Sequence, residues 1–111
     1  MSKLYYDHLI VMKDLEIHIS KMEVSSDEKQ KIYKMVDETI HYRITTRVLN
    51  ELPREHHEHY LELLTRYPYH PKVMEFLKEH VVDIEDKITQ EVKDLEKLFL
   101  SDLSEARKLK K

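Results

Sequence analysis

The sequence predicts an all-α fold, a compact bundle of about five helices around a long second helix. Two observations favour helices over strands. The chain contains no glycine and only three prolines in 111 residues, so it lacks the commonest turn residue of β-hairpins. Apolar residues also recur at helical spacing along most of the chain. Because this length suits one domain, we expect residues 1–111 to form a single helical domain.

The first helix is expected within residues 1–24, from about Leu4 to Met22. The residues that follow helical spacing there are Leu4, His8, Val11, Leu15, His18 and Met22. A strand is the competing interpretation, because apolar and polar residues partly alternate between Leu15 and Val24. No partner strand is visible in the sequence, which favours the helix.

The second helix is the longest, from Ser26 or Asp27 to about Leu52. Ser25 and Glu28 form an S-x-x-E capping box at its start, and Pro53 ends it or opens the next helix. Its main apolar face comprises Ile32, Tyr33, Val36, Ile40, Ile44 and Val48. Residues 25–100 are therefore expected to form the helical core around this element.

Three shorter patterns complete the chain. A third helix is predicted over Pro53–Tyr67, and the segment YPYHP breaks the chain after it. A fourth helix is predicted over Pro71–Val82. Asp83 then caps a fifth helix that reaches at least Leu100, with an apolar stripe of Ile84, Ile88, Val92, Leu95 and Phe99. Residues 101–111 either extend this helix or form a basic, frayed tail.

Two arginines project from the main apolar side of the second helix. Arg47 lies inside the apolar arc and Arg43 at its edge. A guanidinium group at such a position is costly unless it is paired. We therefore expect a structural ion pair with Glu91 or Glu85, within the chain or across a dimer. An anion contact and a side chain extended to solvent are the alternatives.

A second apolar stripe lies on the other side of the same helix, at Met35, Tyr42 and Leu49. A helix that is apolar on two sides is either central in its own fold or shared with a partner. These three residues are therefore a candidate interface with a second copy or with another helical protein. Coverage by the N-terminal helix is the competing explanation.

The segment PREHHEHYLELL (residues 53–64) raises the question of a metal site. Helical geometry spreads His56, His57 and His59 over roughly 160° of the helix surface, so the three rings cannot converge on one ion. His56 and His59 could share a metal with His80 of the fourth helix. Glu38 and His41 match half of a di-iron bundle motif, whose second half is missing. We favour buried or surface histidines over a metal site.

Several classes of function are disfavoured by composition. The chain has no cysteine, no Gly-rich phosphate loop and no G-x-S-x-G nucleophile motif, so neither an enzyme nor a cofactor is expected. Its net charge of −3 disfavours a nucleic-acid binder that would use the basic tail. No signal peptide and no apolar run long enough to span a bilayer is visible, so a cytoplasmic protein is expected.

From Ser25 to about Leu100 the chain resembles a family of small uncharacterised bacterial helical proteins, a domain of unknown function common in candidate-phyla genomes. The resemblance rests on the segments SSDEKQK, YRITTRVLNEL, REHHEHYLELL, VMEFLKEHV and DIEDKITQEVKDLEKL. It implies a small helical fold, no activity, and a structural role for Arg43 and Arg47. The chain departs from the pattern where Val82-Asp83-Ile84 replaces a proline and an aromatic residue, and in its histidine-rich third helix.

Taken together, these patterns predict a non-enzymatic helical interaction module that forms a homodimer or binds a helical protein. The alternative is a His/Glu metal-binding protein that uses His56, His59 and His80.

Overall fold

The computed structural model describes residues 4–109, with side chains as far as Leu103, and the described chain is all-α. Two 3₁₀ turns, η1 (Asp7–Leu9) and η2 (Arg54–His56), accompany five α-helices. The helices are α1 (Lys13–Ser20), α2 (Ser26–Glu51), α3 (His57–Arg66), α4 (Pro71–His80) and α5 (Ile84–Leu109). No strand occurs among these residues, so the predicted fold class is confirmed.

The long helix α2 has the predicted bounds because its ends carry clear signals. The Ser25 hydroxyl accepts a hydrogen bond from the Glu28 amide at 3.2 Å, which satisfies a free N–H group of the first turn. At the other end Leu52 is extended, as expected for a residue before proline. Val36, Ile40, Ile44 and Val48 recur every four residues and are all buried, as predicted for the main face. Ile32 is half-buried, and Tyr33, predicted on the same face, is 41% exposed near the start of the helix.

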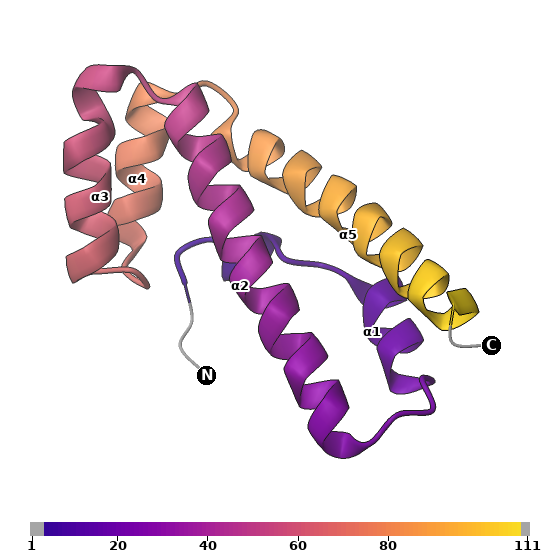
Figure 1. Cartoon of the computed structure of the whole chain (residues 1–111). Coiled ribbons are helices and arrows are strands. Elements are labelled where there is room, and N and C mark those ends of the chain that lie inside the picture. The colour runs from indigo at the N-terminus through magenta and orange to yellow at the C-terminus, as the bar shows by residue number, and fades with distance from the viewer. Residues whose placement is uncertain (1–3, 110–111) are drawn as a thin grey trace.

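Helices α3 and α4 form a hairpin at one end of the molecule (Figure 1). The third helix was predicted from Pro53, but its first turn is the 3₁₀ turn η2. Pro71 stands in the first turn of α4, where a missing N–H costs nothing. The His70 Nδ1 atom accepts a hydrogen bond from the Lys72 amide at 3.0 Å and caps the helix.

The closing helix α5 packs its apolar stripe against α2. All five predicted residues of this stripe are buried: Ile84, Ile88, Val92, Leu95 and Phe99. The helix continues through residue 109, so most of the segment predicted as a possible frayed tail is helical. Residues 110 and 111 of that tail lie outside the described residues.

The predicted continuous helix from Leu4 to Met22 is wrong. Its first half is a turn followed by η1, and only α1 is α-helical. The Tyr5 amide donates to the Pro68 carbonyl at 2.8 Å, and the Leu4 amide donates to the Asp7 carboxylate at 2.8 Å. The backbone of residues 4–10 therefore makes contacts other than the i to i−4 pattern of an α-helix. We call residues 4–12 the N-terminal segment.

The described chain is elongated, with extents of 50 × 23 × 20 Å. The long helices α2 and α5 diverge from the end that carries the α3–α4 hairpin, and α1 packs against α5 towards the other end (Figure 1). This arrangement leaves one long side of α2 without a neighbouring helix in the view (Figure 1).

Candidate interaction surface

The side of α2 that faces away from the core carries exposed apolar residues. Met35 is 45% exposed and Tyr42 is 68% exposed. Leu49, two helical turns after Tyr42, is half-buried and packs against the core. We call Met35, Tyr42 and Leu49, with the polar residues between them, the open face of α2.

The open face follows from the residue spacing. At about 100° per residue, Tyr42 points away from the midpoint of the buried positions Ile40 and Ile44. Met35 and Leu49 are each seven residues from Tyr42, which places them within roughly 20° of the same line. The two apolar sides of α2 are therefore opposite each other: the core buries the first, and of the second only Leu49 packs partly against the core.

The competing explanation, that the N-terminal helix covers this stripe, does not hold in the structure. Helix α1 packs against α5, where Leu15 and Ile19 are buried. Two apolar residues of the region predicted as the N-terminal helix, Val11 and Ile17, are themselves exposed. Within the described part of the chain, Met35 and Tyr42 stay largely open to solvent.

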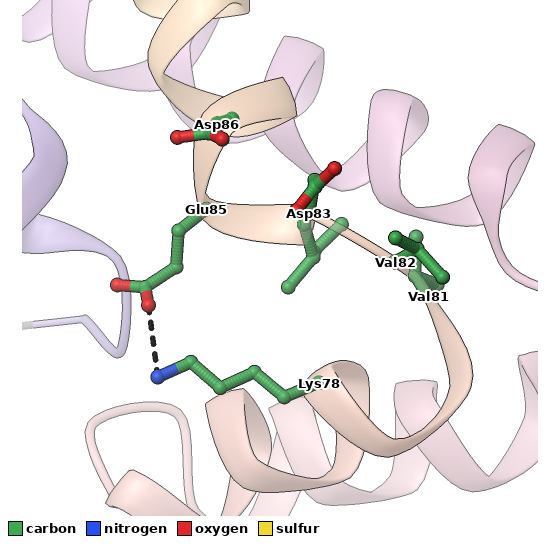
Figure 2. Close-up of a pocket in the computed structure, with 7 residues that line it drawn as sticks. Lys78, Val81, Val82, Asp83, Glu85 and Asp86 are labelled. Carbon is green, nitrogen blue, oxygen red and sulfur yellow. Dashed lines mark ion pairs between the residues drawn. The ribbon is translucent and has the colours of Figure 1, made fainter.

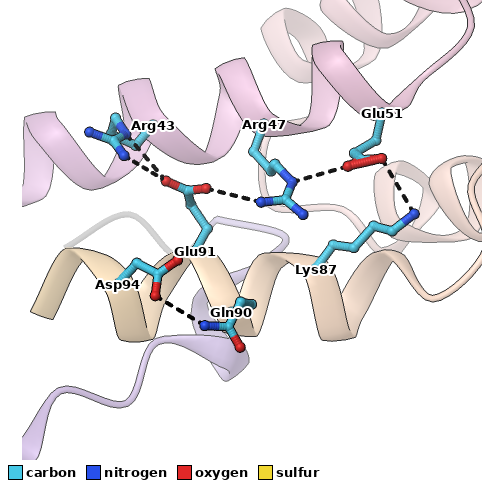
Figure 3. Close-up of polar contacts among 7 residues, drawn as sticks. All are labelled: Arg43, Arg47, Glu51, Lys87, Gln90, Glu91 and Asp94. Carbon is cyan, nitrogen blue, oxygen red and sulfur yellow. Dashed lines mark hydrogen bonds and ion pairs between the residues drawn. The ribbon is translucent and has the colours of Figure 1, made fainter. Parts of the chain in front are cut away.

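The core side of α2 carries an ion-pair network with α5 (Figure 3). Glu91 of α5 lies between Arg43 and Arg47, with Oε2 at 3.1 Å from Arg43 Nη2 and Oε1 at 3.4 Å from Arg47 Nη1. Arg47 Nε also donates to Glu51 at 3.2 Å, and Lys87 Nζ lies 3.3 Å from Glu51. The five charges alternate in sign along the seam between the two helices.

Both arginines of the network bind a carboxylate of the same chain. Glu91 is only 7% exposed, and each of its carboxylate oxygens has an arginine partner. Burial of this carboxylate would be costly without those partners. Arg43 and Arg47 of α2 therefore form ion pairs with Glu91 of α5 within one chain, at the packed contact between the two helices.

The histidines of the candidate metal site lie in an aromatic stack on the α3–α4 hairpin. The ring centroids of His56 and His80 are 3.9 Å apart, with an angle of 30° between the planes. Phe76 contacts His80 at 4.7 Å between centroids, and His59 stacks on Phe76 at 4.6 Å. The four rings bridge the two helices.

This stacking does not resemble a coordination shell. An imidazole binds a metal in the plane of its ring, so rings lying nearly face to face do not direct their nitrogens at one point. The other candidate histidines have protein partners: His57 Nε2 lies 2.8 Å from the Leu52 carbonyl and His41 Nδ1 lies 2.8 Å from the Tyr6 hydroxyl. Among the described residues no three His, Cys, Asp or Glu side chains are grouped to hold a metal ion.

A buried tyrosine cluster was not predicted from the sequence. The hydroxyls of Tyr5 and Tyr60 share a hydrogen bond at 2.8 Å, and the ring of Tyr6 packs edge-on against Tyr5. Burial raises the pKa of each of these three tyrosines above its ordinary value. The cluster joins the N-terminal segment to α3 and, through Tyr6 and His41, to α2. The only feature of the sequence that pointed to this cluster is the pair of adjacent tyrosines that follows Leu4.

A shallow hollow lies at the corner between α4 and α5, lined by Lys78, Val81, Val82, Asp83, Ile84, Glu85 and Asp86 (Figure 2). Lys78 Nζ lies 2.8 Å from the Glu85 carboxylate, which also accepts from His8 Nε2 at 3.0 Å. These two hydrogen bonds lower the pKa of Glu85. The polar contacts of this hollow tie the N-terminal segment and α4 to the start of α5.

Comparisons with known proteins find no matching family model, no similar curated protein and no similar solved structure. The resemblance to a family of helical bacterial proteins stays a prediction. No helix of residues 4–109 is long and apolar enough to cross a membrane.

Proposed function

We propose that the protein is a cytoplasmic, non-enzymatic helical interaction module that self-associates through the open face of α2. One observation carries the proposal. Met35 and Tyr42 are 45% and 68% exposed on the side of the helix opposite the core, and α1 packs elsewhere. A helix with a buried stripe on one side and an exposed apolar stripe on the other is built to contact two partners.

The chemistry of the open face suits a protein partner. Tyrosine and methionine are enriched at protein interfaces, where tyrosine combines a large apolar ring with a hydroxyl that can stay in contact with water. Burying an exposed side chain of this size stabilises a complex by roughly 1.5–3 kcal/mol, less the cost of association. In a symmetric dimer each contribution occurs twice.

The test is sedimentation of the full chain, comparing the variants Tyr42→Glu and Tyr69→Glu. Tyr69 is 66% exposed in the α3–α4 loop, so it matches Tyr42 in residue type and exposure but lies off the open face. We expect the wild type and Tyr69→Glu to form dimers and Tyr42→Glu to be monomeric with unchanged helix content. A monomeric wild type at all accessible concentrations would contradict the proposal.

The alternative, a metal-binding protein, rests on His56, His59 and His80. The contact of the His56 and His80 rings, 3.9 Å apart and tilted by 30°, supports an aromatic role for these rings more than a coordinating one. A zinc titration separates the two: a saturable rise in melting temperature that is lost in His56→Ala would favour the metal-binding function.

A further inference from the structure

The residue spacing of the open face also bears on how two copies would be oriented. Tyr42 stands midway between Met35 and Leu49, with seven residues on each side. Consider a second α2 that runs antiparallel to the first, with the two Tyr42 residues opposite each other. Each residue that precedes Tyr42 in one copy then faces the residue that follows Tyr42 by the same number of positions in the other copy. Met35 then faces Leu49 of the second copy, and Tyr42 faces its own equivalent. The stripe is self-complementary about Tyr42, as a two-fold interface requires.

The charges on the open face distinguish the two possible orientations. Glu38 and Lys31 are exposed and lie close to the line through Met35 and Tyr42. In a parallel, in-register pair each residue faces its own equivalent, so two glutamates and two lysines would meet. Like charges across an interface destabilise it. In the antiparallel pair centred on Tyr42, Glu38 faces Thr46, and Lys31 lies beyond the end of the second copy's α2 at Glu51, so no like charges meet.

The helix dipoles and the length of α2 favour the same orientation. Antiparallel neighbours place the positive end of one helix beside the negative end of the other. Helix α2 continues for nine residues beyond Tyr42 to Glu51, so the two helices would overlap for about 28 Å around the two-fold axis. Tyr42, the most exposed apolar residue of α2, would lie at the centre of this overlap, where interface residues contribute most.

We propose that two copies pair through α2 in antiparallel orientation, with Tyr42 on the two-fold axis and Met35 facing Leu49 of the second copy. This inference rests on the proposed self-association and adds the register and direction of the contact.

The test uses the absence of cysteine from the chain, since any introduced thiol is unique. Three samples of full-length protein are oxidised and run on non-reducing gels: Met35→Cys alone, Leu49→Cys alone, and an equal mixture of the two. A disulfide forms only when the two Cα atoms come within about 7 Å. We expect the mixture to give at least fivefold more covalent dimer than either variant alone. Val82→Cys, exposed in the turn between α4 and α5, is the control for random collision.

The outcomes separate this inference from the proposed function. Met35→Cys that cross-links alone as strongly as the mixture would show a parallel pair and overturn the antiparallel arrangement. A dimer in sedimentation that gives no cross-link above the Val82→Cys control would place the interface elsewhere and also overturn it. If the wild type itself sediments as a monomer, the proposed self-association fails as well.

A second measurement guards against poorly folded cysteine variants. Glu38→Lys is mixed with wild type, and the fraction of mixed dimers is measured by native mass spectrometry. The antiparallel register predicts the statistical fraction of one half, because Glu38 does not face its own equivalent. A parallel register would enrich mixed dimers, since glutamate would then face lysine.

Discussion

At the residue scale, Asp83 holds the least common backbone conformation of the described chain. Its φ angle is +56°, in the left-handed region that most side chains avoid. Aspartate and asparagine tolerate this region because their short side chains can hydrogen-bond locally, whereas β-branched residues do not. Asp83 lets the chain turn sharply from α4 into α5, and its carbonyl accepts the first backbone bond of α5 from Lys87 at 3.0 Å.

We expect Asp83→Val to lower the free energy of unfolding by about 1–3 kcal/mol, because a β-branched residue is strained at positive φ. Asp83→Asn tolerates the same angle and should change stability by less than about 0.5 kcal/mol. Urea denaturation followed by circular dichroism measures both. Equal losses for the two variants would show that the carboxylate, and not the backbone angle, is what the position requires.

Glu85 makes stability depend on pH in a defined direction. Hydrogen bonds from Lys78 and His8 lower its pKa in the folded chain, so the folded state favours the ionised form. This contribution is fully present above the unfolded-state pKa of about 4.3 and is lost as the pH falls through the lower folded pKa. Because the pair is partly exposed, we expect Glu85→Gln to cost less than about 1 kcal/mol at pH 7.

The pH dependence is checked by comparing the denaturation of wild type and Glu85→Gln at pH 7, 5 and 3. The difference between them should shrink towards zero at the lowest pH. A difference that persists at pH 3 would mean that packing, not charge, accounts for the effect.

At the element scale, the network of Arg43, Glu91 and Arg47 defines how α2 and α5 pair. Removing Glu91 would leave two guanidinium groups at a helix seam with one remaining carboxylate, Glu51. Since the arginines are partly exposed and can reach water, we expect Glu91→Ala to cost about 1–3 kcal/mol. Glu62→Ala, which removes an exposed ion pair with Arg66, is the control and should cost less than about 0.5 kcal/mol. Equal effects in thermal melts would contradict a special role for the seam.

The N-terminal segment is held by its tyrosines, and alkaline pH tests this directly. Burial raises the pKa of Tyr5, Tyr6 and Tyr60, so the folded chain keeps these phenols neutral. Their contribution to stability is present below the unfolded pKa of about 10 and is lost as the pH rises past it. We expect the last part of the tyrosinate absorbance at 295 nm to appear together with loss of helix. Complete ionisation of all seven tyrosines in a fully helical chain would contradict this burial.

The elements differ in how well the sequence predicted them. Helices α2 and α5 carry long apolar periodicities, and each begins directly after its predicted capping residue, Ser25 or Asp83. Most of their predicted core positions are buried. The N-terminal segment also showed helical spacing, but Tyr5 binds the Pro68 carbonyl and Tyr60, contacts that join distant parts of the chain. Local periodicity carries no information about such contacts. The same reason explains why the stack of His56 on His80 could not be read from helix geometry alone.

At the scale of the whole molecule, the described chain is an elongated pair of long helices with a hairpin at one end (Figure 1). A chain of this shape has too few elements to surround α2, so one of its two apolar sides stays open. Sequence reasoning identified the open face through Met35, Tyr42 and Leu49 but left its coverage undecided. The position of α1 against α5 removes coverage by that helix.

Native mass spectrometry of the untagged protein, prepared without added metal, tests the central claim most directly because it reports assembly and bound ions together. We predict a metal-free species of twice 13.6 kDa for the wild type and of 13.6 kDa for Tyr42→Glu. A wild-type monomer, above all one carrying a stoichiometric metal ion, would contradict self-association through the open face and would direct attention to His56, His59 and His80 instead.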